Sequence, residues 1–85
     1  MKKLLSTRTV DQRTRLLARL KERGSVSTIE ARKELDILAP APRILELRMD
    51  GHNIPLFWQI EETQLGQKHR VGLYVYLPKI GDIND

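Results

Sequence analysis

The sequence contains no cysteine and no long apolar run, and each absence excludes a class of protein. Without cysteine the chain has no disulfide scaffold and no thiolate metal site, and a reducing cytosol is compatible with it. No segment approaches the roughly 20 apolar residues of a membrane span. Met1–Leu5 resembles the start of a signal peptide, but the polar run Ser6–Thr9 follows at once. We therefore expect a soluble, cytoplasmic protein that does not enter a membrane.

Catalytic and metal-binding patterns are also missing. The two histidines, His52 and His69, have no cysteine beside them, so a metal site would depend on carboxylates. Glu61 and Glu62 are adjacent and fall on opposite faces of a strand, a poor geometry for a catalytic pair. Neither a Walker nor a dinucleotide-binding glycine pattern occurs. We expect no enzymatic activity, no cofactor and no metal.

The net charge of +4 is concentrated at the start of the chain. Residues 1–23 carry a net charge of +6, whereas residues 24–50 and 51–85 carry −1 each. Such an excess attracts a polyanion, because contacts with phosphates release condensed counterions. A first helix with a solvated basic face explains the same charge equally well.

The length of 85 residues allows one domain. We expect a basic N-terminal arm at residues 1–8 and a single folded domain at residues 9–78. Residues 79–85 show no periodicity and are expected to form a loose C-terminal tail.

A first helix is predicted from Val10 to Arg23. Thr9 and Gln12 have the spacing of a capping box, and Gly24 is a natural stop. The 3.6-residue period separates an apolar stripe from a side that should face water, with one arginine on the apolar line. The stripe consists of Val10, Leu16, Leu17 and Leu20, the water-facing side of Arg15, Arg19 and Glu22, and the exception is Arg13.

Two shorter helices follow. Val26 is expected to make a brief strand-like contact, after which Ser27 and Glu30 form a capping box for a helix at about residues 28–35, with Ala31 and Leu35 inside. Residues 36–39 form a bend, and the next helix starts between residues 40 and 42 and ends at residue 50. Proline is tolerated in that first turn because its missing N–H has no intrahelical partner there. Ile44 and Leu47 are its inner residues.

From residue 54 the apolar period changes to two, which predicts two strands joined by the polar loop 62–69. The first strand should bury one alternating set and the second strand another. These sets are Ile54, Leu56, Trp58 and Ile60, then Val71, Leu73, Val75 and Leu77. We interpret Trp58, Tyr74 and Tyr76 as core and hairpin residues in preference to a base-stacking platform.

Three helices followed by a two-stranded hairpin make an α+β, mainly helical domain in the order of a winged helix-turn-helix, whose wing is the hairpin loop. The run SVSTIEARKELDILAPAPRILELRMDGHNI resembles the small helix-turn-helix proteins of bacteriophages, prophages and plasmids. The matching positions are Ser27, Glu30 and Ala31, then Arg43, Ile44, Leu47 and Arg48, then Gly51 and Ile54. The resemblance extends over roughly residues 12–60. It implies a DNA-binding transcriptional regulator.

The candidate DNA-binding residues lie in three places. In the third helix, Arg43 and Arg48 have the chemistry to read guanine edges, and Ala39 and Ala41 are small enough to approach a groove. The other candidates are Ser27 and Thr28 at a helix start that suits phosphate, and Lys68, His69 and Arg70 in the wing. Each has a structural alternative: ion pairs for the arginines, the bend for the alanines, capping for Ser27 and Thr28, and a simple exposed loop for the wing.

The outer side of the third helix supports a second interpretation. Its two arginines are balanced by two acidic residues, and Pro42, Leu45 and Met49 expose apolar surface. Such a face is suited to thymine methyl groups or to a protein partner. We therefore expect double-stranded DNA as the main partner, bound by a homodimer on a palindromic or repeated site. A protein-interaction module using Pro42, Leu45 and Met49 is the alternative.

Overall fold

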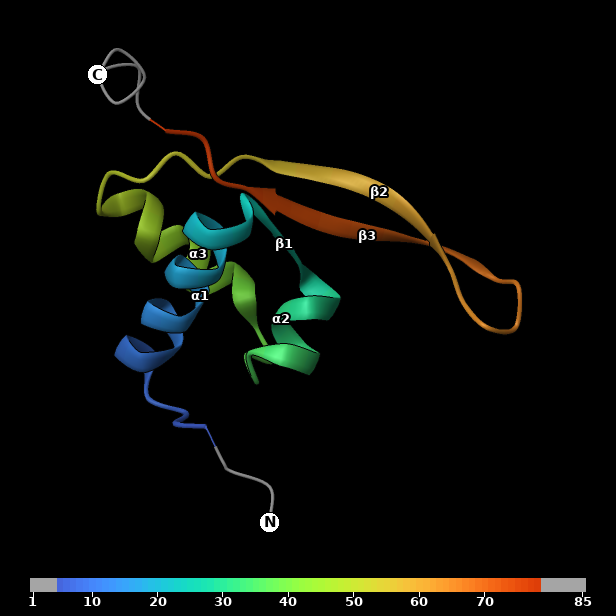
Figure 1. The fold of residues 1–85 in the computed structure, drawn as a ribbon, viewed down its shortest axis with the longest axis horizontal. Helices are drawn as coiled ribbons and strands as arrows, with labels where there is room; N and C mark the ends of the chain where they lie inside the picture. Colours follow the sequence, from blue (N-terminus) through green and yellow to red (C-terminus); the bar gives the residue numbers. More distant parts are fainter. Residues whose placement is uncertain (1–4, 79–85) are drawn as a thin grey trace.

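The computed structural model describes residues 5–78 of the chain. The start of the predicted arm, residues 1–4, and the predicted tail, residues 79–85, lie outside the described residues. Three helices form one body, and a long hairpin projects from it (Figure 1). The elements are α1 (Thr9–Arg23), β1 (Ser25–Ser27), α2 (Thr28–Glu34), α3 (Pro40–Met49), β2 (Leu56–Glu62) and β3 (Lys68–Val75). This order confirms the predicted α+β winged helix-turn-helix fold.

The three strands form one antiparallel sheet in the order β1-β3-β2. The predicted short contact of Val26 is confirmed, because Val26 pairs with Tyr74 of β3. β3 is therefore the central strand, and β2 forms one edge.

Helix α1 begins one residue earlier than predicted, and its predicted capping box is wrong. Arg8 is the N-cap and makes no side-chain capping bond. The backbone of Arg8 is extended (φ −63°, ψ 140°), so the helix begins at Thr9. Gln12 Nε2 donates to the carbonyl of Thr7 at 2.6 Å. The predicted stop is confirmed, since Gly24 has a φ of 83° and its N–H donates to the Leu20 carbonyl.

The basic side of α1 does not face water as expected. Arg15 Nε donates to the Leu35 carbonyl at 2.9 Å, and Arg19 Nη1 lies 3.0 Å from Glu34 Oε1. The reason is that the C-terminal end of α2 lies beside α1 and supplies acceptors there. Of the predicted stripe, Leu16 and Leu20 are fully buried, Leu17 is partly buried and Val10 is exposed.

The capping box of α2 is confirmed. The N–H of Glu30 donates to Ser27 Oγ at 3.0 Å, and Glu30 Oε1 accepts from the N–H of Ser27 at 3.1 Å. The Ser27 side chain is buried. A local sequence signal therefore fixes where β1 ends and α2 begins.

The core lies between the helices and the sheet face that carries Val26 and Tyr74. Ala31, Leu35, Ile44, Leu47 and Ile54 are buried there as predicted. One further core residue was not predicted: Ile37, in the bend, is fully buried and its N–H donates to the Ala31 carbonyl. Tyr74, interpreted above as a core and hairpin residue, is also buried.

Beyond Ile54 the predicted inner faces of the hairpin are confirmed at Val71, which is buried, but are wrong at Trp58, Ile60 and Leu73. Trp58 and Ile60 are 59% and 63% exposed, because the hairpin continues past the helices and has no layer to cover it. In β3 the buried residue at the body is Tyr74 and not Leu73, since Tyr74 pairs with both Val26 and Leu56. The true turn is residues 63–67, so the basic residues from Lys68 onward lie within β3.

Candidate nucleic-acid interface

Helix α3 has one buried side and one free side. Ile44 and Leu47 are buried, and Pro40 in the first turn is also buried. On the outer side Leu45 is 56% exposed and Met49 is 79% exposed. Ala41, Pro42 and Arg48 are exposed as well. The outer side of α3 therefore offers an open, mostly apolar surface with one arginine.

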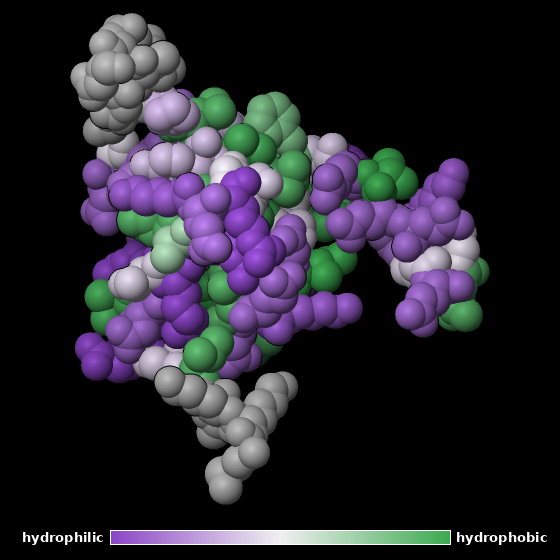
Figure 2. Space-filling model, in the orientation of Figure 1, coloured by the Kyte–Doolittle hydropathy of each residue, from purple (hydrophilic) through white to green (hydrophobic). Residues whose placement is uncertain are grey.

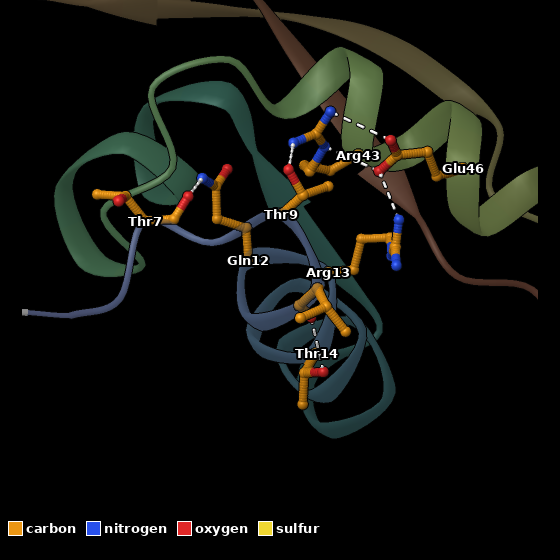
Figure 3. Close-up of polar contacts among 8 residues, drawn as sticks. Thr7, Thr9, Gln12, Arg13, Thr14, Arg43 and Glu46 are labelled. Atoms are coloured by element: carbon orange, nitrogen blue, oxygen red, sulfur yellow. Dashed lines mark hydrogen bonds and ion pairs between the residues drawn. The ribbon is translucent and has the colours of Figure 1, made fainter.

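Arg43 is held inside the protein by its neighbours (Figure 3). Its Nε lies 2.9 Å from Glu46 Oε1, and its Nη2 donates to Glu46 Oε2 at 3.2 Å. Nη1 donates to the hydroxyl of Thr9 at 3.0 Å. Arg13 of α1 also reaches Glu46, at 3.2 Å. This cluster joins α1 to α3, and Arg43 has to leave Glu46 before it can read a base.

Arg48 lies at the other end of α3 and is more available. Its Nε donates to the Ile54 carbonyl at 2.8 Å, which secures the chain as it leaves the helix. The residue is nevertheless exposed. Arg48 is therefore better placed than Arg43 to meet a ligand in solution.

Ala39 and Ala41 are both exposed at the start of α3, where Ala39 is the N-cap. The first turn carries prolines at positions 40 and 42, which have no N–H. Few backbone N–H groups at this end of α3 are therefore free to donate a hydrogen bond to a phosphate. The two small side chains leave its surface accessible to a groove wall.

The hydroxyls of Ser27 and Thr28 already have partners in the fold. Ser27 caps α2, and Thr28 Oγ1 donates to the Gly72 carbonyl of β3 at 3.1 Å. The capping alternative is therefore confirmed for Ser27, whereas the Thr28 hydroxyl connects α2 to the wing and caps no helix. Their predicted role toward phosphate remains a prediction.

The basic residues of the wing are exposed and lie opposite acidic or apolar residues. Lys68 pairs with Glu62 and His69 with Glu61 across the two strands. Arg70 places its guanidinium 4.8 Å from the centre of the Trp58 ring. This contact is a cation–π pair on an exposed surface. The wing therefore presents the cations Lys68 and Arg70, but Glu61 and Glu62 on the neighbouring strand weaken its positive potential.

A groove of about 320 Å³ lies between α2 and the hairpin. Arg32 contributes from α2, and Trp58, His69 and Arg70 contribute from the wing. Arg32 and the neighbouring Lys33 are exposed, and the sequence analysis missed both. The sequence does contain a pattern that indicates their exposure. Both residues directly follow the inner Ala31, so the helical period places them on the outer side of α2. Arg32 and Arg70 therefore place two cations at this groove, and Lys33 lies beside Glu61 and Glu62 in the neighbouring hollow.

Two negative observations hold for residues 5–78. No group of three or more histidine, aspartate or glutamate side chains is close enough together to hold a metal ion. In the same part of the chain, no helix has both the length and the apolar character needed to cross a bilayer.

Comparison with known proteins identifies a family. A family model described as a winged helix-turn-helix domain matches residues 11–77, from the first turn of α1 to just beyond β3. No curated protein and no solved structure matches the chain significantly.

Proposed function

The chain belongs to the family of winged helix-turn-helix domains, and on that basis we propose that it is a sequence-specific double-stranded DNA-binding protein. In this proposal it acts in the cytoplasm as a small transcriptional regulator of a mobile element. The observation that supports it best is the free outer side of α3, in a domain that also has a hairpin projecting from the helical body. A helix needs such a free side to enter a major groove.

In the proposed complex, α3 lies in the major groove with its outer side against the base edges. Leu45 and Met49 meet thymine methyl groups, and Arg48 meets a guanine. Ala39 and Ala41 allow close approach at the start of the helix. Arg43 must break its ion pair with Glu46 before it can contact a base. It therefore contributes less to the free energy of binding than an arginine without such a partner.

Phosphate contacts come from α2 and the wing, which line one groove. The wing supplies Lys68, His69 and Arg70, and the exposed side of α2 supplies Arg32 and Lys33. Ser27 and Thr28 add backbone groups at the start of α2. Since these contacts release counterions, affinity falls steeply as salt rises. A homodimer on a palindromic site adds the affinity that one small domain lacks.

Selection of bound sequences from a random duplex library tests this proposal. We expect one enriched motif, and binding to it that weakens between low and moderate salt. Arg48→Ala and, to a smaller extent, Arg43→Ala should relax the base preference, whereas Lys68→Ala should weaken binding to all duplexes alike. Failure to enrich a motif, together with binding that does not change with salt, would overturn the proposal.

The exposed apolar side of α3 supports a second candidate function, a protein-interaction module. Pro42, Leu45 and Met49 form this surface, and they project where a DNA-binding helix usually carries cations. Under this alternative Leu45→Asp abolishes binding of a protein partner, and the unmodified chain has negligible affinity for any duplex. The library selection therefore separates the two candidates.

A further inference from the structure

Strand β2 has an open edge along its whole length. The sheet order β1-β3-β2 gives β2 one neighbour, β3, among the strands of residues 5–78. The register from Leu56 to Glu62 runs without a bulge. The other side of β2 therefore presents unpaired backbone groups in a regular row, which is a template for another strand.

The hydrogen bonds to β3 determine which backbone groups point to that edge. The N–H of Val75 donates to the Pro55 carbonyl, so these two residues form a hydrogen-bonded pair. The alternation of antiparallel ladders then directs the N–H and C=O groups of every second residue away from β3. The residues that point their backbone groups outward are Leu56, Trp58, Ile60 and Glu62.

This edge lacks the features that usually prevent pairing. Strand β2 has no lysine, no proline and no bulge, and its charges are confined to the last two residues. Trp58 and Ile60 are more than half exposed on one face, and Phe57 is exposed on the other. Figure 2 shows isolated hydrophobic residues on the projecting hairpin, among hydrophilic side chains. An apolar, unprotected edge of this kind is the type that binds another chain.

We propose that the occupant is β2 of a second copy, paired antiparallel about a two-fold axis at Gln59. In this register Trp58 lies opposite Ile60 of the other copy, and Leu56 opposite Glu62. These are the residues whose backbone groups point outward, so each such pair exchanges both of its hydrogen bonds. The register also uses the full length of the strand, from Leu56 to Glu62.

The side chains are self-complementary in the same register. Trp58 and Ile60 of the two copies form one apolar cluster, since they share a face of the joined sheet. Arg70 packs over Trp58 and flanks this cluster on each side. Glu61 lies opposite Phe57, and Glu62 opposite Leu56, so no like charges face each other. Two three-stranded sheets thus join into one continuous sheet.

This dimer surface gives a structural basis to the homodimer in the proposed function. It requires no contact with DNA, so its test is carried out without DNA. Sedimentation of the full chain at up to about 0.1 mM should show a dimer that dissociates on dilution. Ile60→Lys should make it monomeric while its circular dichroism spectrum is unchanged, because the Ile60 side chain is largely exposed. Leu65→Lys adds the same charge at the turn and should remain dimeric.

Cross-linking tests the register and does not depend on the stability of Ile60→Lys. The chain has no cysteine, so Gln59→Cys introduces one thiol per copy. At the two-fold axis the introduced thiols form a non-hydrogen-bonded pair, the closer type, with Cβ atoms about 4.5 Å apart, at the upper end of the disulfide range. Leu65→Cys is the control, since Leu65 is 88% exposed but the two turns lie about 35 Å apart in this register.

Rapid disulfide formation by Gln59→Cys, with slow formation by Leu65→Cys, is the expected result. A wild-type chain that stays monomeric over the whole concentration range overturns the proposal. It is also overturned if Ile60→Lys remains dimeric or if the two thiol variants cross-link at equal rates. The library selection is independent of these outcomes, because a monomer can still bind a half-site.

Discussion

The Nε atom of Arg43 lies 2.9 Å from Oε1 of Glu46, within the same helix that is proposed to read DNA. The same carboxylate also pairs with Arg13 of α1. Glu46 therefore has two effects at once: it joins two helices and it removes a cation from the DNA-facing element. The first stabilises the fold, and the second weakens attraction to phosphate.

We predict that Glu46→Gln binds duplex DNA more tightly, by several-fold at low salt, because it releases Arg43 and removes one negative charge from α3. The free energy of unfolding should fall by about 1–3 kcal/mol, since the partly buried arginines lose their partner. Fluorescence anisotropy with the selected duplex measures the first effect, and urea denaturation measures the second.

Asp50→Asn is the matched control for this prediction. It makes the same change in charge at the C-terminal end of α3, where Asp50 is exposed. Should both variants gain the same affinity, the release of Arg43 contributes nothing and the gain reflects net charge alone.

The two capping boxes expected from the sequence are predicted to differ in energy. Ser27→Ala removes a real cap from a buried position and should cost about 1–2 kcal/mol of unfolding free energy. Thr9→Ala changes the first helical residue of α1, whose hydroxyl only accepts from Arg43, and should cost less than about 0.5 kcal/mol. Thermal and urea denaturation of both variants compares them directly. Equal losses would contradict the cap assignment of α1.

The sequence predicted well what depends on short-range signals. The Ser27–Glu30 box, the glycine stop at Gly24 and the inner residues Ile44 and Leu47 were all correctly located. Each is set by the residues within one or two helical turns. The order of the elements followed from these boundaries, so the fold was accessible.

The features that could not be predicted from the sequence are those that depend on which helix or strand packs against which. Arg15 has no local reason to turn from water, and its acceptor is a carbonyl 20 residues later. The alternation in β2 predicted a buried face, but its length could not reveal that Trp58 and Ile60 extend past the helices. At the candidate site, Arg43 was singled out by its position in α3, and only the fold brings Thr9 and Arg13 toward it.

The basic charge of α1 is predicted to serve stability more than DNA binding. Arg15→Ala should lower the free energy of unfolding by about 1–2 kcal/mol, because the Leu35 carbonyl at the end of α2 loses its donor. Lys21→Ala removes the same charge from an exposed position of α1 and should change stability by less than about 0.5 kcal/mol. Urea denaturation of the two variants tests this.

The same pair also tests the polyanion interpretation of residues 1–23. If α1 served as a phosphate-binding surface, Lys21→Ala would weaken binding to the selected duplex more than Lys68→Ala in the wing. We expect the reverse order, because the proposed complex assigns phosphate contacts to the wing and none to α1.

The contact between α2 and the wing is predicted to require glycine at position 72. A Cβ atom there would lie 3.1 Å from Leu56 Cδ1 and 3.3 Å from Thr28 Oγ1. The threonine hydroxyl cannot retreat without losing its bond to the Gly72 carbonyl. We expect Gly72→Ala to cost about 1 kcal/mol of unfolding free energy, because the strain of overpacking exceeds the gain from a less flexible unfolded chain.

A double-mutant cycle with Leu56→Ala separates strain from backbone effects. Leu56→Ala removes the nearer of the two obstructing atoms, so the cost of Gly72→Ala should shrink or change sign in that background. The thermal midpoints of the four proteins give the coupling. If Gly72→Ala costs the same with and without the Leu56 side chain, the crowding between α2 and the wing is relieved by other movements. The position of the wing relative to α2 would then depend on the Thr28 hydrogen bond and not on the absence of a side chain at Gly72.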